Sequence, residues 1–371
     1  MKFDSERAKR VRANVVKGIK PLVSFGVPTY NQEKYVAEAI KSAFAQTYQP
    51  LEIIISDDCS KDGTWNIIQR MVAEYKGPHR VVLNRNEKNL GVTKHFELIM
   101  TLCSGDFYTG CSGDDIALPE KVQIMVDRWA EDDYRPMVCY TNMYWMEEDG
   151  TKGDRFINGK PLNPQSRKEF LRSPATTMPG ASAGVSSDIN DIFGELNPTH
   201  SSSEDNARAI RGVMLDHLVY IDTPTMYWRK SGLWSGMVGK PEFDKKKYHD
   251  VMVKSEAIAR QALVDAMQLK DYEMIRAMTC WWNECDYRRR AVEESLWKIP
   301  FMLLSSWRRG AKFWHLARWT YHALKYKWRY VVMDTLFSHP PHADMGDREI
   351  IYEKKSSDFD TDSDTINSEV H

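Results

Sequence analysis

Short apolar runs alternate with helix-like segments through the first 150 residues of the chain. Runs such as Leu22–Val27 and Glu52–Ser56 have the length and the β-branched content of buried strands. The segments between them place apolar residues three or four positions apart, which is the period of an amphipathic helix. The pattern predicts strands at residues 22–27, 52–56, 80–83, 107–111 and 137–146, and helices from residue 64 onward and at residues 32–46, 93–102 and 119–129.

This alternation is typical of an α/β fold, in which helices cover a mostly parallel sheet. Ligands of such sheets bind at the carboxyl ends of the strands. The loops that follow these ends are Pro28–Asn31, Asp57–Asp62 and Ser112–Asp115. We therefore expect the functional residues in these loops.

The second half of the chain has a less regular pattern. Residues 151–200 are rich in Gly, Pro, Ser and Asn, so we expect loops there. A helix is predicted from Ser203 to about Asp216, and residues 245–335 are predicted to be helical throughout. Residues 343–371 hold nine acidic residues against three basic ones and few apolar ones, which predicts a disordered tail.

The composition is that of a globular protein. The chain has 371 residues, of which 42% are hydrophobic, and a formal net charge of −1. These values disfavour a uniformly basic nucleic-acid binder and a highly charged disordered protein. The six cysteines include no C-x-x-C pair, so we expect reduced thiols in a cytosolic setting rather than a zinc ribbon. No secretory leader is recognised, and no run approaches the roughly 18 apolar residues of a transmembrane helix.

The near-zero net charge hides a basic segment rich in tryptophan. Residues 296–330 hold eight Lys or Arg, no acidic residue, and five of the twelve Trp. Apolar residues at 304, 307, 311, 314, 321, 324 and 328 recur at helical spacing and predict one amphipathic stripe. Basic helices rich in Trp are typical of proteins that lie on anionic membranes, and the basic residues 1–20 would add a second contact. Alternatively, the stripe packs on the rest of the molecule.

Two of the predicted strands end in adjacent carboxylates, Asp57-Asp58 and Asp114-Asp115. Acid pairs at one edge of a sheet repel each other unless a cation or hydrogen-bond donors lie between them. Hard oxygen ligands suit Mg²⁺ or Mn²⁺, with substrate phosphates completing the shell. The alternatives are that Asp57, Asp58 and Asp62 cap the next helix, and that Ser112–Asp115 is an ordinary turn.

Six segments of the chain, in this order, carry a family resemblance. They are Val27–Asn31, Ala43–Tyr48, Glu52–Thr64, Asn89–Gly91, Ser112–Asp115 with Pro119, and Ser203–Asp205 followed by Tyr220–Pro224 and Tyr227–Arg229. Together they resemble the family 2 inverting glycosyltransferases, which have the GT-A fold. The resemblance covers about residues 21–232.

The resemblance implies roles for the loop residues. Pro28, Thr29, Tyr30 and Asn31 would line the base and ribose of a nucleotide-sugar, and Asp57, with Asp58, would bind the base. The second acid motif of the family normally reads Asp-x-Asp, and its second Asp ligates the metal on the diphosphate. That Asp is Asp114 here, and the donor site would also include Gly113 and Asp115. The first Asp of the motif is replaced by Ser112, which can bind ribose but offers no charge. Lys94 is either a phosphate contact or a solvated lysine.

Downstream, the resemblance implies that Asp205 is the catalytic base, beside Glu204 in the donor site. An inverting transfer needs a base because the acceptor hydroxyl loses its proton as it attacks. A divalent metal would stabilise the charge on the leaving nucleoside diphosphate. The alternative is that Glu204 and Asp205 are ordinary first-turn acids, which the helix dipole favours, with Ser203 as the N-cap.

The expected protein is thus a metal-dependent, non-processive glycosyltransferase that moves one sugar from a nucleotide-sugar to a hydroxyl acceptor. The acceptor is expected to be a glycan or a lipid-linked glycan, handled at the cytoplasmic face of the plasma membrane, with no nucleic acid as partner. The expected parts are a basic segment at 1–20, a GT-A domain at 21–240, a helical region at 241–335 and an acidic tail at 336–371. The alternatives are a catalytically silent, membrane-associated scaffold and a nucleotidyltransferase, although the latter usually has a Gly-rich loop after its first strand.

Overall fold

The computed structural model describes residues 4–321, except 164–165, 173, 175–177, 198–202, 231–244, 295–297, 314–315 and 318–319. The side chains of residues 245–249 and 292–293 are also outside the description. The predicted acidic tail lies beyond the described residues, as do Trp297, Trp314, Trp319 and Trp328 of the basic, Trp-rich segment.

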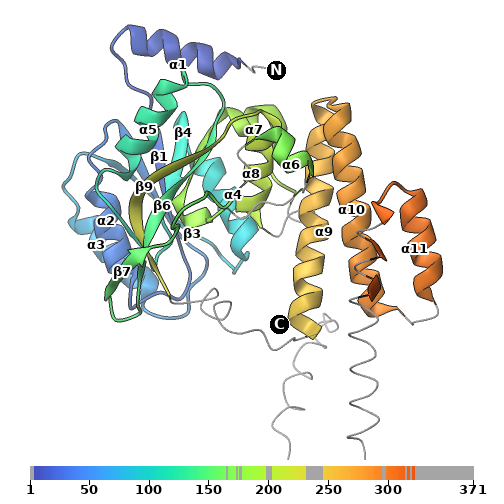
Figure 1. Ribbon diagram of the computed structural model, residues 1–371. Coiled ribbons are helices and arrows are strands. Elements are labelled where there is room, and N and C mark those ends of the chain that lie inside the picture. Colours follow the sequence, from blue (N-terminus) through green and yellow to red (C-terminus); the bar gives the residue numbers. More distant parts are fainter. Residues whose placement is uncertain are drawn as a thin grey trace, which may run out of the picture. The chain divides into compact units, whose positions relative to one another are not determined.

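Within the described residues, nine strands form one mixed sheet (Figure 1). The first four strands in space are parallel, and β8 then runs antiparallel to both of its neighbours, β4 and β6. In spatial order the strands are β3 (Arg80–Arg85), β2 (Leu51–Asp57), β1 (Val23–Thr29), β4 (Phe107–Gly110), β8 (Ala183–Ser186), β6 (Val138–Met146), β9 (Leu218–Arg229) and β5 (Ile116–Ala117), and β7 (Lys152–Arg155) pairs with β6.

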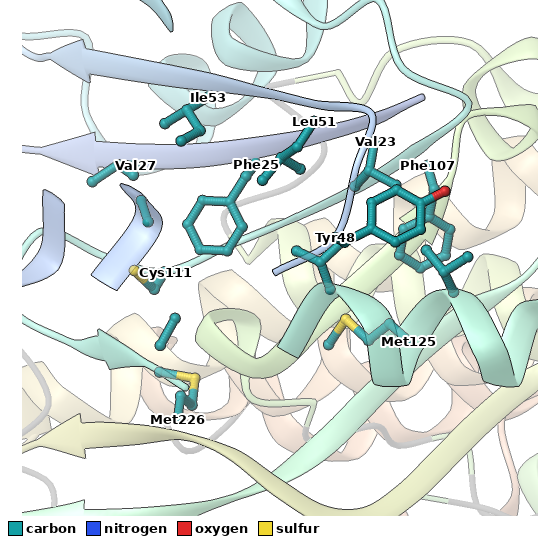
Figure 2. Close-up of a cluster of buried hydrophobic side chains, with 14 of the residues drawn as sticks. Val23, Phe25, Val27, Tyr48, Leu51, Ile53, Phe107, Cys111, Met125 and Met226 are labelled. Carbon is teal, nitrogen blue, oxygen red and sulfur yellow. The ribbon is translucent and has the colours of Figure 1, made fainter. Parts of the chain in front are cut away.

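Alternate side chains of the sheet are buried on its two faces. Val23, Phe25 and Val27 of β1 are fully buried on one face, in the cluster shown in Figure 2. Helices α2 (Val36–Phe44), α3 (Thr64–Glu74) and α5 (Lys121–Glu131) add residues to this cluster. Each such side chain contributes roughly 1.5–3 kcal/mol through burial.

The opposite face is covered by other helices. Ile54 and Tyr108 pack with residues of α4 (Val92–Leu102), and Tyr140 packs with residues of α8 (Glu204–Met214). Helices therefore cover both faces, and the loops at the carboxyl ends of the strands stay together at one edge.

The expectation of loops over residues 151–200 is wrong. The segment contains β7, α6 (Arg167–Arg172), a 3₁₀ turn at Gly180–Ser182, β8 and α7 (Asp188–Phe193). Strand β8 reads Ala-Gly-Val-Ser, so it lacks an apolar run that would reveal it. Its Gly184 is required because a Cβ there would lie 2.8 Å from the Phe107 ring and 2.9 Å from the Cys139 sulfur.

The basic first 20 residues contain helix α1 (Glu6–Val16), which packs on the domain. The Ser5 hydroxyl caps the helix by accepting from the amide of Ala8 at 2.9 Å, and Val11 is buried in the core. Arg7 pairs with Asp191 at 2.6 Å and Arg10 with Asp106 at 2.5 Å. Part of the basic charge of this segment is therefore paired within the protein.

Among the described residues, the sheet is followed by the helices α9 (Lys245–Gln268), α10 (Tyr272–Glu293) and α11 (Ile299–Arg308). The prediction of one helical stripe through residues 304–328 is wrong, because α11 ends at Arg308 and Gly310 has a φ of +99°. Trp307 is 51% exposed before this break, whereas Ala311 is buried after it. In the part of the chain that the structure describes, no helix is long and apolar enough to cross a membrane.

Candidate active site

Two of the predicted loops meet at the carboxyl ends of β1 and β4. The amide of Gly113 donates to the carbonyl of Pro28 at 3.0 Å, which places the Ser112–Asp115 turn beside the end of β1. A Cβ on Gly113 would lie 2.7 Å from the Thr29 methyl and 2.4 Å from Oε1 of Gln32. Only glycine fits this close approach without displacing a neighbour.

Asp57 lies at the end of β2, in register with Thr29 on β1. Its buried carboxylate accepts from the Ser60 amide at 3.0 Å and from the Thr29 hydroxyl at 3.4 Å, and it lies 3.4 Å from Nε of Arg85. Asn31, with a φ of 51°, donates its amide to the Ser60 hydroxyl at 2.9 Å. The loops after β1 and β2 are therefore joined, while the Tyr30 ring beside them is 43% exposed.

Asp58 is buried, and its hydrogen bonds run to a third segment. Its carboxylate accepts from the Asn86 amide group at 2.8 Å and from the amides of Leu90 and Gly91 at 2.9 and 3.0 Å. It thereby holds the turn that begins α4, whose first turn carries the exposed Lys94. Of the three acids for which capping was considered, Asp62 bonds to the start of α3, at the amide of Thr64 (3.0 Å).

Arg229 of β9 anchors the second acid turn. The half-buried Asp114 accepts at its carbonyl from Nε of Arg229 at 2.9 Å, and the buried carboxylate of Asp115 accepts from the Arg229 amide at 3.0 Å. The Arg229 guanidinium also pairs with Glu38 at 2.5 Å and lies 4.5 Å from the centre of the Tyr35 ring. Sequence reasoning placed Arg229 in a family block but gave it no role.

The second oxygen of Asp115 has no hydrogen-bond partner among the described residues. Burial, together with the neighbouring Asp114 charge, raises the pKa of Asp115 well above its ordinary value. In the described ranges no three His, Cys, Asp or Glu residues are grouped so that they could hold a metal. These residues would fit a metal only at an open site, in which Asp114 would supply an oxygen and substrate phosphates the others.

The pair Glu204-Asp205 begins α8 and is half-buried. Asp205 accepts from the Ser203 hydroxyl at 2.5 Å and from the Asn206 amide at 2.7 Å, and it also accepts a backbone hydrogen bond from Gly180. Ser203 occupies the N-cap position, but its side chain makes no capping bond to the helix. Three hydrogen bonds therefore fix the Asp205 carboxylate.

The environment of this pair favours the protonated acids. Burial, followed by the neighbouring Asp205 charge, raises the pKa of Glu204 to about 7. Burial also raises the pKa of Asp205, although its hydrogen bonds partly oppose the shift. A carboxylate whose pKa approaches the working pH is well suited to accept a proton in a reaction.

The loop that contacts Asp205 and the second acid turn lie at the same edge of the sheet. Strands β4 and β8 pair with Thr109 opposite Gly184, so the residues just before β8 adjoin the end of β4. Lys121 of α5 links them, because its Nζ donates to the carbonyls of Gly110 and Ala181. Sequence reasoning missed Lys121, and nothing in its local pattern distinguishes it from a solvated lysine at the start of a helix.

Comparisons with known proteins agree with this architecture. The family described as Glycosyl transferase family 2 matches residues 24–191. The chain is 30% identical over 141 residues to the putative glycosyltransferase EpsE of Bacillus subtilis, covering 38% of this chain and 50% of that protein. It is 28% identical over 152 residues to the putative colanic acid biosynthesis glycosyl transferase WcaA of Escherichia coli K12, covering 41% and 53%. The chain thus spans about half the length of these relatives.

A solved structure of Staphylococcus aureus TarS, residues 1–349, has a TM-score of 0.50 to this chain at 15% identity and covers 88% of this chain and 94% of that one. This likeness concerns the fold alone. With the mixed, mostly parallel sheet and its two helical layers, it confirms the predicted GT-A fold. Over residues 24–191 the chain is similar to glycosyltransferase family 2.

Proposed function

We propose that the protein is an inverting, non-processive glycosyltransferase that moves one sugar from a nucleotide-sugar to a hydroxyl acceptor. The observation that supports this most is the meeting of three acid-bearing segments at one edge of the sheet. Hydrogen bonds link the Asp57 loop to the end of β1, the Asp114 turn to the same strand end, and Asp205 to the loop before β8.

The nucleotide-sugar would bind against the ends of β1, β2 and β4. Thr29 and Asp57, held in register, would face the base, with the exposed ring of Tyr30 beside them. Ser112 would offer a neutral hydroxyl to the ribose in place of the carboxylate that is usual in the family. The ribose of the donor would therefore be recognised by hydrogen bonds to a neutral group more than by charge.

Asp205 would accept the proton of the acceptor hydroxyl. Its three hydrogen bonds hold the carboxylate in one orientation, so little reorganisation is needed when it takes the proton. Asp114 would hold Mg²⁺ or Mn²⁺, which when bound would neutralise charge on the diphosphate.

The acceptor is proposed to be a glycan, in part because one relative is named for colanic acid biosynthesis. A lipid-linked acceptor at the inner membrane face would suit α11, where Phe301 and Trp307 are 70% and 51% exposed. Lys298 and Arg308 lie at the two ends of this helix, so the apolar residues have basic neighbours. The double variant Phe301→Ser/Trp307→Ser should no longer float with anionic liposomes. The control Tyr272→Ser, which alters an exposed ring on α10, should float like the wild type. Equal flotation of the two variants would exclude α11 as the membrane-binding surface.

The test of the proposed activity begins with a thermal-shift screen of UDP- and GDP-sugars with Mn²⁺. The sugar that raises the melting temperature is then used to measure release of the nucleoside diphosphate. Asp114→Ala and Asp205→Asn should each lower the rate by roughly 100-fold or more. Wild-type rates in both variants would contradict the site assignment. Donor binding without turnover would favour the silent scaffold, and nucleotide release from a nucleoside triphosphate would favour a nucleotidyltransferase.

A further inference from the structure

Lys121, the first residue of α5, has an exposed fraction of 0%. Its Nζ donates to the carbonyl of Gly110 at 2.5 Å and to the carbonyl of Ala181 at 2.7 Å, and it lies 3.6 Å from the sulfur of Met226. No ion pair involving Lys121 occurs in the part of the chain that the structure describes. An ammonium group is thus buried with backbone carbonyls as its main partners.

The surroundings of this ammonium are unfavourable for a charge. Burial lowers the pKa of Lys121 to about 8, although the nearby Cys111, Asp115 and Cys139 oppose this effect. An unbranched apolar side chain of similar length would fill the space without the cost of burying a charge. Packing alone therefore does not explain a lysine at this position.

The two carbonyls belong to segments on different sides of the candidate active site. Gly110 ends β4 and is followed by Cys111 and the Ser112–Asp115 turn. Ala181 follows Gly180, whose backbone donates to Asp205 and whose Cα lies close to that side chain, since a Cβ built there would be 3.2 Å from the Asp205 Cβ. Lys121 therefore connects the turn that carries Asp114 with the loop that contacts Asp205.

We propose that Lys121 is a positioning residue, which fixes the loop before β8 against the end of β4 and so sets the placement of Asp205 relative to the bound donor. This inference rests on the proposed function. Lys121 is buried and touches only protein groups, so it acts through the two segments that it joins. Without Lys121, the segment keeps the hydrogen bond from the Thr109 hydroxyl to the Ala183 carbonyl but loses the bond to Ala181, the neighbour of Gly180. The loop that contacts Asp205 is then held less firmly.

The first experiment compares Lys121→Met with Met125→Ala, which alters a fully buried core residue on the same helix. We expect Lys121→Met to lower kcat by roughly 10- to 100-fold with the donor KM within about threefold of wild type, because small misplacements of a base act on the chemical step. Met125→Ala should lower the melting temperature but leave kcat near wild type. Equal kcat values in the two variants would overturn the proposal.

A double-mutant cycle gives the second readout. If Lys121 acts through Asp205, then Lys121→Met should add less than about threefold to the loss already caused by Asp205→Asn. Multiplying effects would overturn the positioning role. Where Lys121→Met does not fold, Lys121→Gln, which removes the charge but keeps an N–H donor, enters the same cycle. A wild-type protein that releases no nucleoside diphosphate would contradict the proposed function itself, which separates the two failures.

Discussion

At the scale of single residues, the candidate site combines rigid carboxylates with two acids that resist ionisation. Asp57 and Asp58 each accept hydrogen bonds from the protein, and Asp205 is held by three. Burial raises the pKa of Glu204 and Asp205 toward the pH at which the protein would work. The hydrogen bonds that orient Asp205 thus also partly oppose the rise in its pKa that burial causes.

The raised pKa values predict how activity depends on pH. A base must be deprotonated to act, and the pair Glu204-Asp205 holds a proton up to about neutral pH. The rate of nucleoside diphosphate release should therefore rise between about pH 6 and pH 8. In Asp205→Asn the residual rate should lose this rise. A rate that is flat from pH 5 to pH 8 in the wild type would show that neither acid is the base.

The same pKa shift should make the free energy of unfolding fall as the pH rises, whereas the activity rises. Folding raises the pKa of Glu204 from its ordinary 4.5 to about 7, so the folded state binds a proton more tightly than the unfolded state. The contribution to stability is complete below about pH 4.5 and is lost as the pH rises to about 7. Glu204→Gln lacks this titration. Its free energy of unfolding relative to wild type should therefore be higher at pH 8 than at pH 5, by on the order of 1 kcal/mol. Urea unfolding at the two pH values measures this gain, and an equal effect at both would argue against the shift.

At the scale of elements, the site depends on how closely two strand ends and their turns approach. Strands β1 and β2 could be predicted because their apolar runs are unmistakable, and the acids that follow them pointed to the correct edge. Strand β8 could not be predicted, because a Gly-Ser-containing strand between two others is defined by its neighbours and not by its own hydrophobicity. Lys121 and Gly180 were missed for a related reason, since their roles arise from contacts with residues on other elements. Lys121 reaches Ala181, 60 positions further along the chain, and Gly180 contacts Asp205, 25 positions further along.

The approach of the Ser112–Asp115 turn to Thr29 predicts the effect of Gly113→Ala. The added methyl group would collide with Thr29 and Gln32, and the turn must move. We expect the affinity for the selected nucleoside diphosphate with Mn²⁺ to fall roughly tenfold, at a stability cost of about 1–3 kcal/mol. Asp62→Ala is the control, because it removes a hydrogen bond to the Thr64 amide at the start of α3, at a cost of about 1 kcal/mol, and does not alter the Ser112–Asp115 turn. Isothermal titration distinguishes the two, and equal affinities would show that the turn does not contact the donor.

At the scale of the whole molecule, the helices after the sheet support the helix that carries Asp205. Arg211, on α8, forms a doubly hydrogen-bonded pair with Asp265 of α9, at 2.8 and 3.1 Å, and both side chains are buried. The guanidinium also donates to the Gly194 carbonyl at 2.8 Å. The region after residue 240 is thus joined to the GT-A domain through the same helix that begins with the acid pair.

This connection predicts a large stability loss for Arg211→Met. The change leaves the Asp265 carboxylate buried without its cation, and we expect the free energy of unfolding to fall by about 3–5 kcal/mol. Arg167→Met, which breaks the more exposed pair with Asp271, should cost about 1 kcal/mol or less. Urea denaturation followed by Trp fluorescence measures both. Similar losses in the two variants would mean that the buried pair contributes no more than a surface one.

Because β8 lies between β4 and β6, the sheet can close only late in the synthesis of the chain. Strand β4 ends at residue 110, but the strand that covers its open side begins at residue 183, so synthesis must continue for more than 70 residues before the sheet can close. Until then the nascent chain exposes an unpaired strand edge, which is prone to pair with other chains. A chain that stops at residue 150 should therefore aggregate during refolding where one that continues past β9 does not. We therefore do not expect the first 150 residues to fold on their own, although they hold most of the recognisable motifs.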